Sequence, residues 1–233
     1  MRRALVTGGT RGIGAAIAVC LRDAGADVTV TGTRKANAAP KGCRYVACDF
    51  LNTSEIERLA TLIGGLELSI LINNAGINAV GPVDGYDPVQ FAQIQQVNVT
   101  APFRLCQAVV PGMRRRRFGR IVNITSIFSV VSKAGRAAYS ASKCALTGLT
   151  RALALEVAAE NVLVNCVAPG FVDTDLTRRV LGQKGMAAVR KQIPVGRLAA
   201  TEEIARLVRF LASEDNSYVT GQNIVIDGGF TVA

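Results

Sequence analysis

Near its start the chain reads Thr7-Gly8-Gly9-Thr10-Arg11-Gly12-Ile13-Gly14, a glycine-rich stretch between a strand-like run at 3–7 and a helical stretch at 13–24. Gly8 permits a tight turn, Gly12 lets the backbone approach a pyrophosphate, and Gly14 lets the helix pack closely on the strand. Phosphates would then lie at the helix N-terminus, where amide groups and the helix dipole favour anions. In isolation the stretch is also compatible with an ordinary strand–helix turn. Its position between strand and helix favours a dinucleotide site.

The same alternation of strand and helix continues along the chain. It predicts a parallel sheet covered by helices, and the apolar run at 69–73 is typical of a strand buried on both faces. The chain has 233 residues, of which 49% are hydrophobic. We therefore expect one domain, residues 1–233, with an α/β fold: a Rossmann-type, doubly wound, parallel seven-stranded sheet with helices on both faces. The strand-like runs are 3–7, 27–31, 44–48, 69–73, 119–125, 162–167 and 222–226.

A second informative stretch is Tyr139-Ser140-Ala141-Ser142-Lys143, with Ser126 thirteen positions before the tyrosine. The chain has no histidine, so a general acid must come from another residue type. Residues four apart share a helix face, which lets Tyr139 and Lys143 point into one cleft. An ammonium about 4 Å from the phenol favours the phenolate by roughly 4 kcal/mol, or about three pKa units. The alternative is an exposed helix that carries a chance tyrosine and lysine.

These motifs occur with others in the order and spacing of a known enzyme family. On all of them together the chain resembles the short-chain dehydrogenases/reductases from end to end. The resemblance implies the strand order 3-2-1-4-5-6-7, with the site at the carboxyl ends of the strands. It also implies a homotetramer, built by pairing the helices at 99–117 and 139–159 and by the C-terminal strand region. The matching pieces are 7–14, with its spacing G-x3-G-x-G, Asn73-Asn74-Ala75-Gly76, Asn98, Ser126, 139–143 and Pro169-Gly170.

The resemblance also implies a catalytic role for four residues. Tyr139 would be the acid/base, and Lys143 would modulate its pKa and bind the nicotinamide ribose. Ser126 would orient the substrate, and Asn98 would hold a water that links Lys143 to solvent. Asn98 could instead cap the helix that follows, which is a common use of asparagine.

A charge argument favours NADP(H) over NAD(H). An NAD enzyme usually carries an acidic residue at the end of the second strand. Here that strand is followed by Gly32-Thr33-Arg34-Lys35, and Arg11 adds a second cation from the glycine stretch. A 2′-phosphate would meet Arg11, Arg34 and the Thr33 hydroxyl. Both arginines could also be solvated surface groups.

The segment 34–43, with Pro40 and Gly42, is short for a crossover between parallel strands, so we expect its helix to be reduced to a turn.

The family pattern places the remaining cofactor contacts. Asn74 to Gly76 would close over the adenosine, Asp49 would bind the adenine amino group, and Val172 and Thr174 would touch the carboxamide. The expected cofactor-binding residues are Gly8, Thr10, Arg11, Gly12, Ile13, Gly14, Thr33, Arg34, Asp49, Asn74, Ala75, Gly76, Tyr139, Lys143, Pro169, Gly170, Val172 and Thr174.

The charge of the chain is strongly positive, with 27 Lys and Arg against 17 Asp and Glu, a net charge of +10. The cations are densest in Met113-Arg114-Arg115-Arg116-Arg117-Phe118-Gly119-Arg120. Arginines at a helix C-terminus complement the helix dipole. Within the family the chain most resembles the bacterial 3-oxoacyl-[acyl-carrier-protein] reductases, and this resemblance implies instead that Arg114–Arg117 and Arg120 form a dock for an acidic acyl carrier protein. Glu160 stands where that subgroup has a second basic residue. No groove-reading or base-stacking element supports nucleic-acid binding.

Several further expectations come from what the sequence lacks. The six cysteines have neither a histidine nor a CxxC partner, so we expect reduced thiols and no metal site. No apolar run reaches the length of a membrane span, and no signal peptide precedes the first strand. We therefore expect a cytoplasmic protein without a membrane association.

The segment 175–193 contains Gly182 and Gly185 and is expected to form a mobile substrate lid. Our first hypothesis is NADPH-dependent reduction of a ketone to a secondary alcohol, the ketone being a 3-oxoacyl thioester, either free or carrier-bound. Alternatives are a dehydrogenase of another alcohol (secondary metabolite, steroid or sugar) and a non-catalytic NADPH-binding regulatory module. Residues expected in an apolar substrate wall are Phe128, Val130, Val131, Phe171, Leu176 and Met186.

Overall fold

Seven strands form a single sheet in the computed structural model, which describes residues 2–34 and 39–233. The strand order is β3-β2-β1-β4-β5-β6-β7, and every neighbouring pair runs parallel. The predicted doubly wound parallel sheet and its strand order are both confirmed. The strands are β1 (Arg3–Val6), β2 (Asp27–Gly32), β3 (Arg44–Ala47), β4 (Leu68–Asn73), β5 (Gly119–Ile124), β6 (Val162–Pro169) and β7 (Asn223–Ile226).

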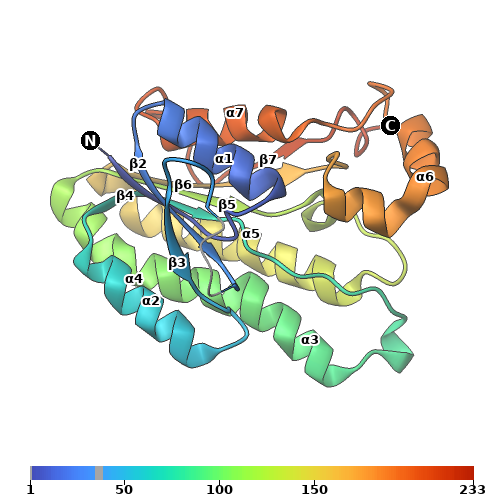
Figure 1. The fold of residues 1–233 in the computed structure, drawn as a ribbon, viewed down its shortest axis with the longest axis horizontal. Helices are drawn as coiled ribbons and strands as arrows, with labels where there is room; N and C mark the ends of the chain where they lie inside the picture. Colours follow the sequence, from blue (N-terminus) through green and yellow to red (C-terminus); the bar gives the residue numbers. More distant parts are fainter. Residues whose placement is uncertain (1, 35–38) are drawn as a thin grey trace.

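Helices cover both faces of this sheet (Figure 1). One face is covered by α1 and α7, and the other by α2, α4 and α5. The helices α6 and α3 lie at the end of the molecule toward which the strands run. The helices are α1 (Gly12–Asp23), α2 (Thr53–Gly65), α3 (Pro88–Gln95), α4 (Ala101–Arg116), α5 (Ala137–Val157), α6 (Asp175–Gln192) and α7 (Thr201–Ala212), with short helical turns η1 (Val83–Gly85), η2 (Gln96–Thr100), η3 (Ile127–Ser129) and η4 (Ala158–Glu160).

The central strand β1 shows why both faces need cover. Leu5 packs into the core layer under α2, α4 and α5, whereas Ala4 and Val6 pack into the layer under α1 and α7. Successive side chains of a strand point to opposite faces, and all three are at most 1% exposed. A strand buried on both faces is continuously apolar, which is the pattern that predicted it.

The link between β2 and β3 is short, as predicted. Thr33, Arg34 and residues 39–43 contain no helix, and a turn from Pro40 to Cys43 is closed by a 3.0 Å backbone hydrogen bond. Lys35 and residues 36–38 lie outside the described residues. The described part of this link therefore agrees with a crossover reduced to a turn.

The predicted lid at 175–193 is the helix α6, which is divided at Gly182. Gly182 has φ 61° and ψ −179°, a backbone conformation that glycine adopts without strain. None of the residues of α6 is buried. An element with so little buried surface can open at low free-energy cost, which suits a lid.

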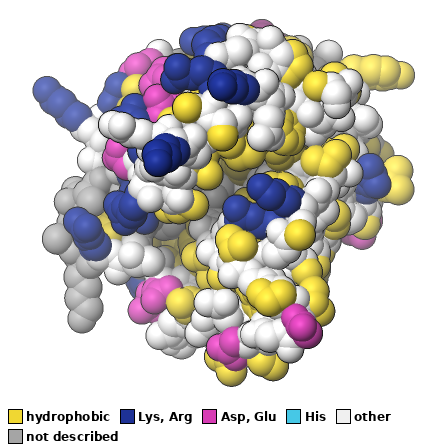
Figure 2. Space-filling model, turned by 90° about the vertical axis from the view of Figure 1, so that its right-hand side faces the viewer, with side chains coloured by type: hydrophobic (Ala, Val, Ile, Leu, Met, Phe, Trp, Pro, Cys, Tyr) yellow, Lys and Arg dark blue, Asp and Glu magenta, His cyan; other side chains and the backbone are white. Residues whose placement is uncertain are grey.

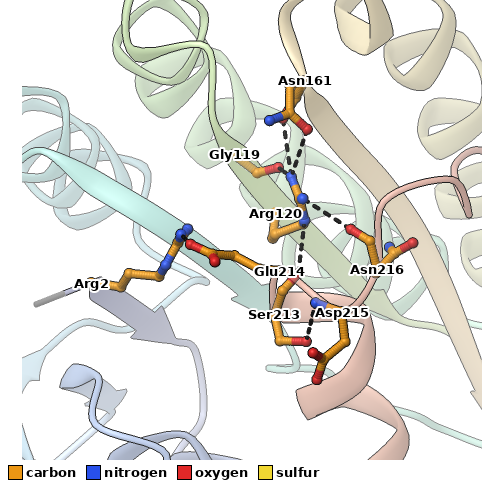
Figure 3. Close-up of polar contacts among 8 residues, drawn as sticks. All are labelled: Arg2, Gly119, Arg120, Asn161, Ser213, Glu214, Asp215 and Asn216. Atoms are coloured by element: carbon orange, nitrogen blue, oxygen red, sulfur yellow. Dashed lines mark hydrogen bonds and ion pairs between the residues drawn. The ribbon is translucent and has the colours of Figure 1, made fainter.

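Arg120 is a structural residue, so its predicted place in a docking surface is wrong. The side chain is only 2% exposed. Its guanidinium donates to the backbone carbonyls of Ser213 at 3.1 Å, Asn161 at 3.0 Å and Asn216 at 2.9 Å (Figure 3). It also lies 4.3 Å from the centre of the Phe118 ring. All these partners are neutral, and burial lowers the Arg120 pKa to about 10.

The other arginines of the cluster lie at the end of α4, at the amino edge of the sheet. Arg114 donates to the carbonyl of Glu156 at 2.6 Å, and Arg117 donates to the carbonyl of Ala159 at 3.0 Å. Both carbonyls lie near the C-terminus of α5, where cations are stabilising. Arg114, Arg115 and Arg117 are nevertheless exposed. This part of the predicted docking surface therefore remains accessible.

Replacing Arg120 by methionine should destabilise the fold. Methionine fills similar space but leaves several buried carbonyls without donors, so we expect a loss of about 2–4 kcal/mol in the free energy of unfolding. Denaturant titration measures it. Arg115→Met, which removes an exposed guanidinium from the same segment, is the control and should change stability little. Equal stability of the two variants would contradict the structural role of Arg120.

Candidate active site

The predicted site residues collect at the carboxyl ends of four neighbouring strands. The glycine turn follows β1, Asn74 to Gly76 follow β4, Ser126 follows β5, and Pro169 ends β6. Ligands of doubly wound sheets bind at this edge, where the strand order reverses. Figure 2 shows this face of the molecule, with a hollow bordered by hydrophobic side chains and by Lys or Arg side chains.

The glycine turn has a tight backbone at Gly8 and a close approach at Gly14, while the predicted approach of Gly12 to a pyrophosphate stays a prediction. Gly8 has φ 62°, in the left-handed region. A Cβ on Gly14 would lie 2.3 Å from the Gly8 carbonyl oxygen and 2.5 Å from Asn74 Nδ2. The Cβ position of Gly12 lies 3.7 Å from the Thr174 side chain, and α1 begins at Gly12 without an acidic residue in its first turn. The turn is thus bare backbone at a helix N-terminus, and a pyrophosphate fits there.

Thr7 has a role that the sequence did not reveal. Its hydroxyl accepts hydrogen bonds from the backbone amides of Asn74 at 2.9 Å and Ala75 at 3.0 Å. The Asn74 side chain donates to the carbonyls of Thr7 at 2.9 Å and Gly8 at 3.2 Å. These bonds join the loop after β4 to the glycine turn. The only sequence signal was the hydroxyl residue directly before the first glycine.

The end of β2 lies against the glycine turn. A Cβ on Gly32 would lie 2.8 Å from the Thr10 methyl group. Thr33 and Arg34 follow directly and are exposed, as is Arg11. The segments that carry the three groups predicted to meet a 2′-phosphate therefore lie side by side. Ile13, two residues after Arg11, packs on the core layer under α1.

Two further side chains order the adenosine side of the site. The Tyr45 hydroxyl donates to the carbonyl of Arg34, which fixes the backbone after β2. Asp49 Oδ1 accepts from the amide of Leu51 at 3.0 Å, and the Asp49 amide donates to the Glu55 carboxylate at 2.7 Å. The carboxylate of Asp49 is thereby held just beyond β3. Its contact with adenine stays a prediction.

The segment after β6 is fixed against the C-terminal part of the chain. A Cβ on Gly170 would lie 2.7 Å from the Asp227 Cβ, so only glycine fits there. Val172 is 4% exposed and forms a parallel bridge with Ala199. Thr174 caps α6 through its side chain. The predicted nicotinamide segment is therefore held by contacts up to Thr174, the residue that precedes α6.

Asn98 lies in the π-helical turn η2, between α3 and α4, and is completely buried. Its side chain accepts from the amide of Ile77 and donates to the carbonyl of the same residue, both at 2.9 Å. It also donates to Ser142 Oγ at 3.0 Å. A Cβ on Gly76 would lie 3.3 Å from Asn98 Oδ1 and 3.5 Å from Lys143 Nζ. Asn98 thus braces the loop beside Lys143 and does not cap α4.

Tyr139 and Ser126 are brought together as predicted, but the electrostatics differ. Burial raises the Tyr139 pKa, while a hydrogen bond with Ser126 and the charge of Arg136 oppose this rise. Lys143 Nζ lies 5.6 Å from the centre of the Tyr139 ring and donates to the Ile124 carbonyl at 2.8 Å. The Lys143 ammonium is thus directed to a backbone carbonyl, and its predicted lowering of the Tyr139 pKa stays a prediction.

Lys143 is itself perturbed by its surroundings. It is 3% exposed, and burial lowers its pKa to about 8. A lysine that titrates near neutral pH can accept and release a proton during turnover.

The cleft has the glycine turn at one end and Ser126, Tyr139 and Lys143 at the other, and this arrangement fits a nicotinamide dinucleotide. The bound nicotinamide would supply hydride chemistry next to Tyr139.

Comparisons with known proteins agree with this geometry. A family model described as enoyl-(acyl carrier protein) reductase matches residues 8–231. The chain belongs to the short-chain dehydrogenase/reductase family, and it is an oxidoreductase with a nicotinamide nucleotide cofactor. The described residues contain no helix long and apolar enough to cross a membrane.

Individual relatives match over nearly their full length. The 3-oxoacyl-[acyl-carrier-protein] reductase of Vibrio cholerae is 39% identical, over 97% of this chain and 96% of its own. The enzyme of the same name from Aquifex aeolicus is 40% identical, over 97% and 95%. A gluconate 5-dehydrogenase from Burkholderia cenocepacia, solved with NADP and tartrate, is 31% identical, with a TM-score of 0.91 over 100% of this chain and 96% of its own.

Substitution of Gly14 by alanine should weaken cofactor binding. The added Cβ would collide with the Gly8 carbonyl and with Asn74, so the turn must open and lose its fit to phosphates. We expect the dissociation constant for NADPH to rise by roughly tenfold or more, measured by fluorescence titration. Gly65→Ala, at a position with nothing within 4 Å, is the matched control. Unchanged binding by Gly14→Ala would refute the role given to this turn.

Proposed function

We propose that the protein is an NADPH-dependent ketoreductase whose substrate is a 3-oxoacyl thioester. The observation that carries this proposal is the constellation of Ser126, Tyr139, Lys143 and Asn98 at the end of the cleft opposite the expected 2′-phosphate site. A binding module would need the glycine turn but has no use for a half-buried phenol that is hydrogen-bonded to a serine. This argues against the non-catalytic alternative.

Each of the four residues has a task in ketone reduction. The Tyr139 hydroxyl, whose pKa burial raises, stays protonated at neutral pH and donates its proton to the substrate oxygen. Ser126 donates a second hydrogen bond to that oxygen and sets its position. Lys143, with a pKa of about 8, can return a proton to the phenol. Asn98 holds the loop at Gly76 beside the lysine.

The choice of NADPH rests on the charges at the end of β2. Arg11, Arg34 and Thr33 lie on segments that are side by side here, and β2 is followed by no carboxylate in the described residues up to Arg34. A 2′-phosphate is a dianion, so two guanidinium groups favour it over the free ribose hydroxyl. The relative from Burkholderia cenocepacia that was solved with NADP supports the same choice.

Replacing Thr33 by aspartate should reverse this preference. The new carboxylate would repel a 2′-phosphate and could accept hydrogen bonds from ribose hydroxyls. We expect the ratio of kcat/KM for NADPH to that for NADH to fall by roughly tenfold or more. Thr61→Asp, an exposed site on α2, brings the same charge elsewhere and should leave the ratio unchanged. If Thr33→Asp left the ratio of kcat/KM for NADPH to that for NADH unchanged, the 2′-phosphate of the cofactor would not bind near Thr33.

The thioester assignment rests on the relatives and on the apolar surroundings of Tyr139. Phe128 packs edge to face on Tyr139, with ring centres 6.3 Å apart. Val130 is 55% exposed and Leu176 is 66% exposed, so both are available to an acyl chain. Two relatives with about 40% identity are named 3-oxoacyl-[acyl-carrier-protein] reductases. A carrier-bound substrate would then dock on Arg114, Arg115 and Arg117, without Arg120.

The quaternary structure proposed with this function is a homotetramer. The outer faces of α4 and α5 would pair between copies, and two exposed apolar side chains support this. Phe103 on α4 is 48% exposed, and Leu155 on α5 is 87% exposed. Pairing these helices between copies would remove both side chains from water, which is favourable in free energy.

A second candidate is a dehydrogenase of a polyhydroxylated acid, favoured by the likeness to the gluconate 5-dehydrogenase from Burkholderia cenocepacia. One assay separates the candidates: oxidation of NADPH and NADH, followed by absorbance, with acetoacetyl-CoA and with acetoacetyl carrier protein. Oxidation that favours NADPH and the carrier-bound ketone supports the proposal. Turnover of gluconate with NADP, and none of either thioester, would support the second candidate.

Replacing Tyr139 by phenylalanine should abolish turnover while leaving cofactor binding intact. Loss of the proton donor should lower kcat by about 100- to 10,000-fold, because a positioned general acid contributes this much. Absorbance assays and NADPH titration measure the two effects. Tyr218→Phe makes the same change at a side chain that is 95% exposed and should have wild-type kcat. Persistent activity of Tyr139→Phe would mean that another group is the acid.

A further inference from the structure

The position of Ser126 depends on the short turn η3 that follows it. The Ser126 hydroxyl accepts a hydrogen bond from the amide of Phe128 at 3.2 Å. The Ser126 carbonyl accepts two more, from the Ser129 amide at 2.8 Å and from the Ser129 hydroxyl at 2.6 Å. A carbonyl oxygen that has both lone pairs occupied cannot turn freely. The backbone of the serine that would orient the substrate is therefore held by Ser129.

Ser129 is held in turn by Asn223, the first residue of β7. The two residues are 94 positions apart in the sequence, and Asn223 Nδ2 donates to Ser129 Oγ at 2.9 Å. On its other side Asn223 Oδ1 accepts from the Thr125 hydroxyl at 2.8 Å. Thr125 is 3% exposed, and its hydroxyl also lies 3.0 Å from the carbonyl oxygen of Val167 in β6. These bonds run from β6 through β7 to the backbone of Ser126.

The direction of these bonds requires an amide side chain at position 223. The Ser126 carbonyl can only accept, so the Ser129 hydroxyl must direct its single proton there. Its neighbour Asn223 must then donate to Ser129 and also accept from Thr125. An asparagine side chain carries one group of each kind, whereas an ionised carboxylate can only accept. The asparagine thus fits both of its partners.

The strand β7 also contacts the predicted nicotinamide segment. Asn223 pairs in parallel register with Cys166 of β6, at the start of β7. At the other end of β7 the carbonyl of Ile226 accepts from the amide of Gly170 at 3.0 Å. One strand therefore holds the turn after Ser126 and the segment expected to receive the nicotinamide. Hydride transfer requires the carbonyl and the nicotinamide in a defined geometry, and a shared strand can supply it.

We propose that Asn223 is a positioning residue for the reduction: it holds the Ser129 hydroxyl on the Ser126 carbonyl, and so fixes where the Ser126 hydroxyl meets the substrate oxygen. The inference rests on the proposed ketone reduction and adds a residue that acts through Ser126. A displacement of about 1 Å in a catalytic group can lower a rate by about 100-fold, so a contact of this kind is measurable in kcat.

Replacing Asn223 by leucine removes both hydrogen-bonding groups at similar volume. We expect kcat with acetoacetyl-CoA and NADPH to fall by roughly 10- to 100-fold, with the dissociation constant for NADPH unchanged. Asn223→Asp should have the same effect, because an ionised carboxylate would draw the Ser129 proton away from the Ser126 carbonyl. Gln222→Leu is the matched control, since it removes an exposed side-chain amide from the preceding residue and should keep the wild-type kcat.

A double-mutant cycle separates positioning from loss of structure. If Asn223 acts through the Ser126 hydroxyl, Asn223→Leu should lower kcat little further once Ser126→Ala is present. An equal fold-loss in both backgrounds would indicate a merely structural role and overturn the proposal. Ser129→Ala, a smaller change, should lower kcat as Asn223→Leu does, whereas Ser129→Thr keeps the hydroxyl and should retain most of the wild-type kcat. Wild-type kcat in Asn223→Leu or in Ser129→Ala would also overturn the proposal.

Crystal structures test the same contact if the wild-type protein reduces no ketone. In Asn223→Leu we expect Ser126 to be displaced from Tyr139, with β7 in its wild-type position. Absent turnover together with this displacement would reject the proposed ketone reduction and retain the role of Asn223 in placing Ser126. An undisplaced Ser126 in the variant would overturn the inference, whether or not the wild type is active.

Discussion

The hydrogen bonds between Thr7 and the loop after β4 are the constraint on which the site depends. β1 and β4 are neighbours at the point where the strand order reverses, so the loops that follow them must share a small volume. The Thr7 hydroxyl accepts from two amides of the β4 loop, and Asn74 returns bonds to the glycine turn. The absence of a side chain at Gly14 makes room for Asn74. These hydrogen bonds satisfy polar groups of the glycine turn and of the loop after β4, so the two segments can lie together beside a ligand.

A network of hydrogen bonds between buried polar side chains holds α5 against the sheet. Asn73 of β4 donates to Asn123 of β5 at 2.8 Å, and Asn123 donates to Thr150 of α5 at 2.7 Å. Cys166 of β6 donates to the same threonine at 3.0 Å. Polar groups in a core are stabilising only when they are paired, and then they favour one arrangement over others. This hydrogen-bond network fixes the position of α5 relative to the strand ends, and with it the positions of Tyr139 and Lys143.

Charge has different functions at the two edges of the sheet. At the amino edge Arg120 is enclosed by backbone carbonyls and the Phe118 ring. Its hydrogen bonds join β5 to the loops that hold Asn161, Ser213 and Asn216. At the carboxyl edge Arg11 and Arg34 have exposed side chains beside the cleft. Desolvation of an arginine is costly, so a guanidinium stays buried only where carbonyls surround it. The net charge of +10 therefore combines structural arginines with others that are available to ligands.

The sequence by itself determined the parallel sheet and the glycine turn, because strand periodicity and glycine spacing are local properties. The strand order and the expected site residues came from the resemblance of the whole set of motifs to short-chain dehydrogenases/reductases. Only the tertiary structure decided what the side chains do. The Lys143 ammonium bonds to a carbonyl of β5, burial raises the Tyr139 pKa, and Arg120 turns inward. The role of Thr7 likewise depends on partners that are distant in sequence. Burial and hydrogen bonding depend on which segments meet in space, and a linear motif does not carry that information.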